Sequence, residues 1–375
     1  MDLLIGGGLA AFTIYAAAKW QKSDKEKIQH TFRNLNYKVK DKEPKHFKTH
    51  KTDQYTLYSY HVPYGLVDDD KLNVLEKVLN KPVGVSFANQ KLHIKVYKQT
   101  LPAKVSYDWT ETEGWTLPIG ISLDGPVMHD FDKIPHMTVA GMTRNGKSVL
   151  LKLILGHLIN SNPDDVEFYV LDLKEKLEFG PYENLRQVKG VAGNVHESKE
   201  MLEDVLKNIK SDMADFRKKG YTNVLDTDIK KRKFIIVDEA AELAPPSFAG
   251  KDDKKPYQYC QHVLSEIARI AGALGYRLIY ACQYPTAENM PRQIKQNADA
   301  KISFRLPTEV ASRVALDEQG AETLNNVGRA IYRTAEKHVI QVPYVADSDI
   351  KGRFVDYVST DEKATERRTD TVIFG

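Results

Sequence analysis

The sequence predicts an α/β protein with a mostly parallel sheet, preceded by a small α+β domain and an N-terminal transmembrane helix. Apolar strand candidates alternate with helical segments over the larger, C-terminal part, which is typical of a parallel sheet covered by helices. A shorter stretch before them follows a β-α-β-β order, and the first residues are apolar. The predicted division is a membrane anchor over 1–20, a basic juxtamembrane linker over 21–51, the α+β domain over 52–104, the α/β domain over 105–350 and a polar tail over 351–375.

The N-terminal segment carries no charge from Leu3 to Ala18, and lysines follow it. Sixteen helical residues span about 24 Å, slightly less than a bilayer core of roughly 30 Å. Because the lysines lie after the segment, the positive-inside rule places the remaining chain on the cytoplasmic side. We expect residues 1–20 to form a single-pass anchor in the cell membrane, with the rest in the bacterial cytoplasm. A cleaved signal peptide and a buried helix are the alternatives.

Two regions separate this segment from the α/β domain. Residues 21–51 are rich in lysine, so they are expected to rest on anionic lipid or to form a solvated helix. Residues 52–104 contain YTLYSYHVP, then an amphipathic DDDKLNVLEKVLN, then VGVSFA and LHIKVYK. This small domain shows no catalytic constellation, and oligomer contact or docking is its expected role.

A phosphate-binding loop is predicted at residues 141–148, which read GMTRNGKS in the spacing G-x-x-x-x-G-K-S. The loop lies between a short apolar strand and an apolar helix, whose N-terminus favours an anion. In such loops the lysine reaches the terminal phosphates and the serine hydroxyl ligates Mg²⁺. The alternative is a glycine-rich turn before a core helix. The predicted nucleotide-binding residues are Gly141, Met142, Thr143, Arg144, Asn145, Gly146, Lys147, Ser148 and Val149.

A second apolar strand, KFIIVDEAAEL at 233–243, ends in a pair of carboxylates. Asp238 is predicted to bind Mg²⁺ together with Ser148, and Glu239 to orient and deprotonate the attacking water. The alternative is that this acidic pair lies in a solvated turn or caps the N-terminus of a helix. Together with the phosphate loop, however, the pair predicts ATP hydrolysis.

Further strand candidates also end in polar residues. RLIYACQYP at 277–285 places Gln283, and EFYVLDLKEK at 167–176 places Asp172, at carboxyl ends of strands, where open α/β sheets bind ligands. Gln283 is predicted to sense the γ-phosphate. The alternative for both Gln283 and Asp172 is that they are ordinary loop residues. AKISFRL and GRAIYR predict two more strands, and HESKEMLEDVLKNIKSDMADFRKK predicts a helix.

These motifs occur in an order that resembles the motor domain of the FtsK/SpoIIIE DNA translocases, over roughly residues 117–345. The segments concerned are IPHMTVAGMTRNGKSVL, FIIVDEAAEL, LGYRLIYACQYP, ISFRLPTEVASRVALDEQGAETL and GRAIYR. The resemblance implies a RecA-like P-loop ATPase domain that binds ATP and Mg²⁺, assembles into a hexameric ring and pulls DNA through its pore. The domain with YHVPYGL looks like the one that precedes the motor in FtsK-like proteins of Gram-positive conjugative elements.

The resemblance also assigns roles to individual residues. Lys147, Asp238, Glu239 and Gln283 fall on the family's phosphate, magnesium, water-activating and sensor positions, and Arg313 matches an arginine that the family keeps. In the loop, which in the family usually reads T-G-S-G-K-S, Arg144 and Asn145 replace a glycine and a serine.

The family's arginine positions are matched only in part. Gly272 stands where the family usually carries an arginine before Gly275, while Arg269 remains, and Tyr284 follows the sensor glutamine in place of an arginine. Arg269 and Arg313 are therefore the two candidates for an arginine that acts on a neighbouring subunit.

A DNA track is expected to be held through its backbone. The net charge of only +3 excludes a strong global basic field, so local cations must make the contacts. We expect Lys174, Lys176, Arg292 and Lys295, which follow strand ends near the ATP site, to touch phosphates. Cys260 and Cys282 have no metal-binding spacing and are expected to be free thiols.

The expected biological role is that of a coupling protein in conjugative transfer. No winged-helix module is expected after the motor, and the polar residues 351–375 are expected to be disordered, so another protein would select the DNA. Relaxase and mating-channel proteins are the expected partners. A phage genome-packaging ATPase, a protein-secretion ATPase and a small-molecule kinase are the alternatives.

Overall fold

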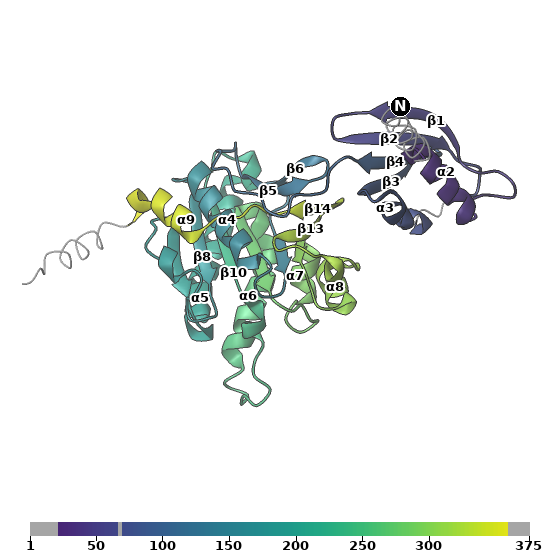
Figure 1. The fold of residues 1–375 in the computed structure, drawn as a ribbon. Helices are drawn as coiled ribbons and strands as arrows, with labels where there is room; N and C mark the ends of the chain where they lie inside the picture. The colour runs from purple at the N-terminus through teal and green to yellow at the C-terminus, as the bar shows by residue number, and fades with distance from the viewer. Residues whose placement is uncertain (1–21, 67–69, 359–375) are drawn as a thin grey trace, which may run out of the picture. The chain divides into compact units, whose positions relative to one another are not determined.

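The computed structural model describes residues 22–66 and 70–358, and the chain divides between Thr100 and Leu101 into two compact units (Figure 1). The N-terminal unit holds α2 (Asp24–Asn34), η1 (Asp70–Asn73), α3 (Val74–Leu79) and a four-stranded sheet. All its strand pairs are antiparallel, in the order β1-β2-β4-β3. The strands are β1 (Lys45–Lys51), β2 (Tyr55–His61), β3 (Val83–Ala88) and β4 (Lys91–Tyr97).

Residues 21–51, expected to be a basic linker, contain α2 and β1 of this unit. A capping box formed by Ser23 and Glu26 begins α2, which satisfies backbone donors of its first turn. Ile28 and Phe32, four residues apart on one helix face, are fully buried, and the Phe32 ring meets Tyr60 of β2 edge to face. These two apolar residues, set among charged ones, pack the helix against the sheet.

The C-terminal unit is built on a ten-stranded sheet in the order β6-β5-β14-β13-β12-β7-β11-β10-β8-β9. Five pairings are parallel and four are antiparallel, so the sheet is mixed, and the predicted parallel arrangement holds only for the strands from β12 to β9. The strands are β5 (Thr116–Ser122), β6 (Gly125–Asp130), β7 (Met137–Ala140), β8 (Val166–Leu171), β9 (Val188–Ala192), β10 (Arg232–Val237), β11 (Tyr276–Cys282), β12 (Ala300–Phe304), β13 (Arg329–Arg333) and β14 (Lys337–Gln341).

Two of the four antiparallel pairs follow from short connections. Only residues 123–124 join β5 to β6, and residues 334–336 join β13 to β14, which is too short for a crossover helix. The parallel half, from β12 to β9, contains the strands that end near the phosphate loop.

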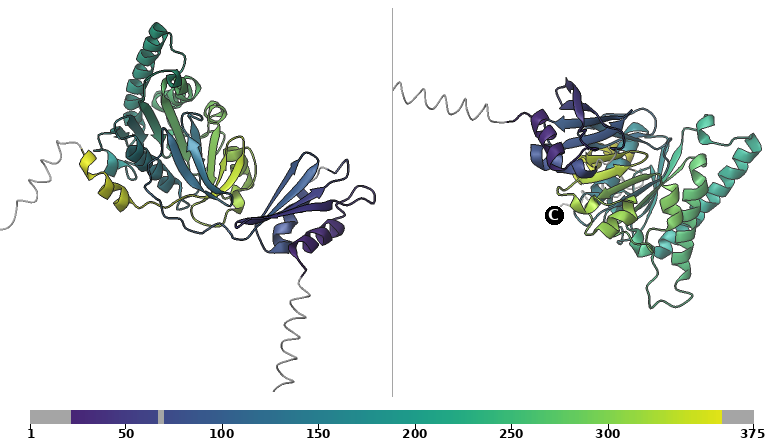
Figure 2. Two further views of the ribbon diagram at one scale, coloured as in Figure 1. Left: turned by 90° about the horizontal axis from the view of Figure 1, so that it is seen from above. Right: turned by 90° about the vertical axis from the view of Figure 1, so that its right-hand side faces the viewer.

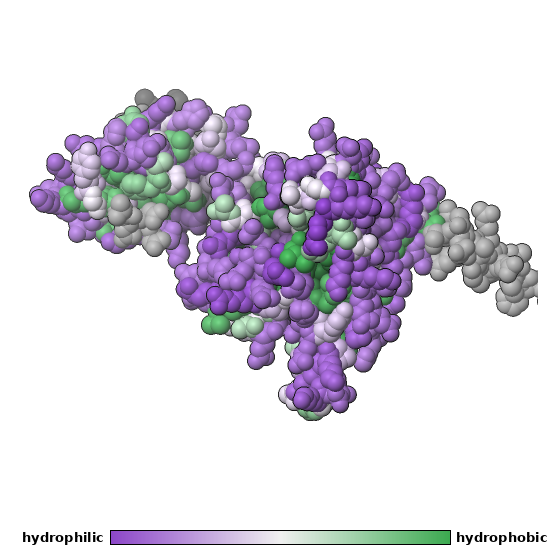
Figure 3. All heavy atoms as spheres, turned by 180° about the vertical axis from the view of Figure 1, so that it is seen from behind, coloured by the Kyte–Doolittle hydropathy of each residue, from purple (hydrophilic) through white to green (hydrophobic). Residues whose placement is uncertain are grey.

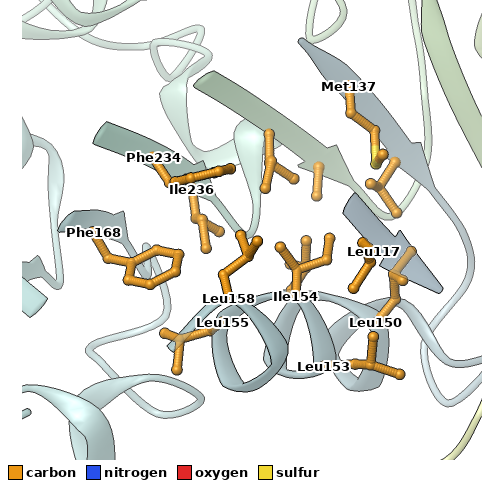
Figure 4. Packing of buried hydrophobic residues seen from close by; sticks show 14 of the residues in the cluster. Leu117, Met137, Leu150, Leu153, Ile154, Leu155, Leu158, Phe168, Phe234 and Ile236 are labelled. Carbon is orange, nitrogen blue, oxygen red and sulfur yellow. The ribbon is translucent and has the colours of Figure 1, made fainter. Parts of the chain in front are cut away.

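Helices cover both faces of the parallel half. On one face lies α4 (Lys147–Ser161), and on the other lie the neighbouring helices α5 (Val195–Lys219) and α6 (Lys255–Ile270), together with α8 (Glu309–Leu316) (Figures 1 and 2). Figure 4 shows Leu150, Ile154 and Leu158 of α4 directed at the strands. The remaining helices are α7 (Arg292–Asn297) and α9 (Asp347–Arg353).

Residues 234–237 of β10 are apolar without interruption because the strand is covered on both faces. Phe234 and Ile236 belong to the core on the α4 side, whereas Ile235 and Val237 belong to the core on the α5–α6 side. A strand covered on both faces buries every side chain, so it has no polar alternation. Seen from behind, the outer surface is largely hydrophilic, with apolar residues confined to patches (Figure 3).

The predicted membrane location needs correction. Among residues 22–66 and 70–358, no helix is both long and apolar enough to cross a bilayer. The expected anchor, residues 1–20, lies outside the described residues. The prediction of a single-pass membrane protein with its larger part in the cytoplasm is therefore wrong for the chain as described. The most apolar helix, α4, is instead a core helix with eleven of its fifteen residues buried.

Candidate nucleotide-binding site

The phosphate loop connects β7 to α4 and packs closely against Phe304 at the end of β12. A Cβ atom on Gly141 would lie 2.7 Å from Phe304 Cβ, and one on Gly146 would lie 2.9 Å from Phe304 Cε1. Gly146 also has φ of +118°, which side chains rarely adopt. Glycine is therefore required at both positions by close approach, as the motif predicts.

The N-terminus of α4 is prepared for an anion. No side chain caps it, and its first turn contains no acidic residue. Unpaired N–H groups and the helix dipole favour negative charge there. Within the loop, Thr143 and Arg144 are exposed, and Lys147 is buried.

Lys147 brings the two predicted carboxylates together. Its ammonium group donates to the backbone oxygen of Asp238, lies 3.0 Å from Asp238 Oδ1 and lies 3.8 Å from Glu239 Oε2. All three side chains are buried, so the charges compensate one another in a site largely closed to water. Asp238 Oδ2 has no hydrogen-bond partner within the described part of the chain, which leaves one ligand position open.

Gln283 connects the loop to Glu239. Thr143 Oγ1 donates to Gln283 Oε1 at 3.0 Å, and the Gln283 backbone N–H donates to Glu239 Oε1 at 3.0 Å. The structure therefore gathers the predicted sensor, base and loop at neighbouring strand ends, because β10 and β11 are parallel neighbours and β11 also pairs with β7.

Asp172 holds the backbone of the loop that follows β8. It is fully buried after β8, and its Oδ2 accepts the backbone N–H groups of Glu178 and Phe179, both at 2.7 Å. Burial raises the pKa of its carboxyl group, and the nearby Asp238 adds to this effect. Asp172 thus shapes the loop that follows β8.

An apolar cavity of about 170 Å³ adjoins the phosphate loop. One side is formed by Gly146 and Val149, and the other by residues 103–105 and 342–344. Lys104 Nζ lies 5.0 Å from the centre of the Tyr344 ring at this wall. Sequence reasoning did not identify the cavity, because residues 103–105 and 342–344 join it only through the fold.

The two candidate arginine fingers lie on the surface. Arg269, near the end of α6, pairs with Glu266 at 2.6 Å, and Arg313 in α8 pairs with Glu309 at 2.7 Å. In the described chain, neither arginine forms a hydrogen bond or ion pair with the phosphate loop or its carboxylates. Arg269 precedes β11, whose opposite end carries Gln283, so it lies toward the other edge of the sheet.

Three of the four residues predicted to contact DNA form ion pairs within the chain. Lys174 Nζ lies 3.3 Å from Glu239 Oε2, Lys176 Nζ lies 3.0 Å from Glu183 Oε1, and Lys295 Nζ lies 2.7 Å from Asp317 Oδ1. Arg292 is exposed and pairs with no carboxylate among the described residues. Lys174 thus belongs to the ATP site itself, a contact that sequence spacing gave no reason to expect.

Comparisons with known proteins agree with this geometry. Residues 103–266 match the model of the FtsK/SpoIIIE family. The DNA translocase FtsK of Leptospira interrogans is 28% identical over 252 residues, covering 62% of this chain and 26% of that protein. FtsK of Streptococcus pneumoniae is 26% identical over 269 residues, covering 66% and 34%. The chain thus spans only 26% and 34% of the length of these two relatives.

Solved structures share the fold. The pCW3 conjugation coupling protein TcpA, in its monomer form with ATPγS, matches 89% of this chain and 99% of its own at a TM-score of 0.66 and 21% identity. The cytoplasmic domain of the Thermomonospora curvata type VII secretion ATPase EccC matches 67% of this chain and 32% of its own, at a TM-score of 0.55 and 21% identity. The larger unit thus combines the phosphate loop and paired carboxylates of an ATPase with a segment, residues 103–266, that matches the FtsK/SpoIIIE family model.

Proposed function

We propose that this chain hydrolyses ATP to translocate DNA and acts as a coupling protein in conjugative transfer. The observation that carries the proposal is the arrangement of Lys147, Asp238, Glu239 and Gln283 at the N-terminus of α4. It supplies a phosphate site, a metal ligand, a base and a sensor in one place.

The residues fit ATP and Mg²⁺. The phosphates would lie against the glycine loop and the N-terminus of α4, where Lys147 would exchange its carboxylate partners for phosphate oxygens. Ser148 and the unpartnered Oδ2 of Asp238 would hold Mg²⁺, which neutralises phosphate charge. The apolar cavity beside Val149 is suited to the adenine ring of ATP.

Glu239 is the proposed general base. It is buried just after β10, where an incoming water would meet it beside the phosphates. Gln283 contacts Thr143 of the loop through its side chain and Glu239 through its backbone N–H, so a change at the terminal phosphate would reach the general base through one residue.

The coupling role is supported by layout. The likeness to the coupling protein TcpA extends over 99% of that chain, whereas the likeness to EccC covers 32% of that chain. Because of the likeness to the secretion ATPase EccC, an ATPase that moves protein substrates is the second candidate function. A hexameric ring, an arginine finger from Arg269 or Arg313 of a neighbouring subunit, and relaxase or channel partners complete the proposal.

Two substitutions test the chemistry. Lys147→Ala is expected to abolish ATP binding, because the buried cation that faces the phosphates is lost. Glu239→Gln is expected to bind ATP with near wild-type affinity and to lose hydrolysis by about 10²-fold or more, because only proton transfer is removed. Equilibrium binding of a fluorescent ATP analogue and steady-state phosphate release measure the two effects.

Lys231→Ala is the control, because Lys231 pairs with Glu167 near the opposite ends of the same strands, β8 and β10. Hydrolysis by Glu239→Gln at the wild-type rate would refute the assignment of the base. Stimulation of the wild-type protein by a protein substrate, and not by DNA, would favour the secretion role.

A further inference from the structure

The ion pair between Lys174 and Glu239 places a solvent-accessible cation on the proposed catalytic base. Lys174 Nζ lies 3.3 Å from Glu239 Oε2. The lysine side chain is 33% exposed, whereas the glutamate side chain is 4% exposed. A ligand arriving from solvent can therefore reach the lysine without entering the site of the base.

Both oxygens of Glu239 are engaged in this arrangement. Oε1 accepts the Gln283 N–H at 3.0 Å, and Oε2 faces the ammonium groups of Lys174 at 3.3 Å and Lys147 at 3.8 Å. Lys147 has phosphate oxygens to move to when ATP binds. Lys174 would then remain as the cation that competes with water for the lone pairs of Oε2.

The backbone next to Lys174 stores strain. Glu175 and Lys176 both have positive φ, at 55° and 61°, although neither is glycine. Such conformations cost energy and persist only where the surroundings impose them. The loop is held at both ends, by the hydrogen bonds of Asp172 to the backbone and by the ion pair of Glu178 with Lys152 at 2.7 Å. Glu175 N–H also donates to the Gly193 oxygen and Lys176 N–H to the Asp172 oxygen, both at 3.2 Å, so the backbone beside Lys174 is fixed and its side chain is the part that can exchange partners.

We propose that Lys174 is a positioning residue that restrains Glu239 and releases it when a phosphate of the nucleic-acid backbone takes the lysine as its partner. This inference rests on the proposed function, because it requires Glu239 to be the base and a polyphosphate track to be the ligand. A lysine ammonium binds backbone phosphates without reading sequence, so any DNA would release the base. Hydrolysis would thereby be confined to subunits that hold the track.

The test compares steady-state ATP hydrolysis of the full chain with and without duplex or single-stranded DNA. Lys174→Ala is expected to raise kcat without DNA about two- to fivefold, the range that a partly exposed ion pair can contribute, with KM for ATP unchanged. The ratio of rates with and without DNA is expected to fall by a similar factor. Lys174→Arg keeps the charge and is expected to raise the rate without DNA less than Lys174→Ala does.

The matched control is Lys231→Ala, which removes the lysine of another lysine–glutamate pair, 3.0 Å from Glu167 Oε1, near the opposite ends of β8 and β10. It is expected to change neither kcat nor the response to DNA. A rate without DNA that is unchanged or lower in Lys174→Ala would overturn the restraint. An undiminished DNA response in that variant would overturn release by the track.

The two measurements also separate this inference from the proposed function. The rates of ATP hydrolysis without DNA test whether Lys174 restrains Glu239, whatever polymer the protein moves along. A wild-type protein that hydrolyses ATP but does not respond to DNA would refute DNA as the track, and an inactive wild-type protein would refute the proposed ATPase.

Discussion

Arg144 occupies a backbone conformation that suits glycine. Its φ is +64°, and it stands where FtsK-like loops usually carry glycine. The sequence identified the loop from its glycine and lysine spacing, because those residues are contiguous and the local geometry determines them. It gave no measure of the strain at Arg144, which appears only in the folded backbone.

Arg144→Gly is expected to raise the free energy of unfolding by up to about 1 kcal/mol, because relief of the left-handed strain exceeds the entropy that glycine adds to the unfolded chain. Urea denaturation measures the change. Lys210→Gly, at an exposed position within α5, is the control and is expected to lower the free energy of unfolding by about 1 kcal/mol. A lower free energy of unfolding in Arg144→Gly would contradict the claim that the backbone at Arg144 is strained.

At the scale of elements, strand ends were predictable and strand directions were not. Asp238 and Gln283 end buried apolar strands, and parallel neighbours bring such ends together whatever lies between them. The antiparallel pairings of β13 and β14 depend on a three-residue connection, and the contact of Lys174 with Glu239 depends on how one loop closes over the next strand. Neither the strand pairing nor this loop contact produces a periodic pattern of residues that could be recognised in the sequence.

Buried histidines at β6 and before β7 give these elements a pH dependence. His136 accepts the backbone N–H of Leu278 in β11 at 3.0 Å, and burial, aided by the nearby Arg277, lowers its pKa to about 3. Burial likewise lowers the pKa of His129 to about 4. Unfolded histidines titrate near 6.5, so below that pH the unfolded chain gains protons that the folded chain does not bind. Stability is present above pH 6.5 and is lost as the pH falls.

His136→Asn, which keeps an acceptor for the Leu278 N–H, is expected to reduce this loss. Between pH 7 and 5.5, the free energy of unfolding should fall by about 1 kcal/mol less in the variant than in the wild type. Urea titrations at both pH values give the difference, and the exposed His262 supplies the control His262→Asn. Equal losses in wild type and His136→Asn would show that folding does not lower the pKa of His136.

At the scale of the whole molecule, the sequence located the ATPase domain better than the parts around it. Five ordered motifs carry the resemblance to the FtsK/SpoIIIE family, whereas α2 buries few apolar side chains, chiefly Ile28 and Phe32, and its sequence resembles a charged linker. The domain boundaries, the ring and the DNA contacts stay predictions. Arg292 is the predicted contact that is exposed and free of an ion pair among the described residues.

ATP-dependent displacement of a triplex-forming oligonucleotide from duplex DNA tests the central claim most directly, because displacement requires movement along the track. The full chain is expected to displace the oligonucleotide only with hydrolysable ATP, while Glu239→Gln binds ATP and displaces none. Hydrolysis by the wild-type chain without displacement from DNA of any length would contradict the assignment of this protein as a DNA translocase.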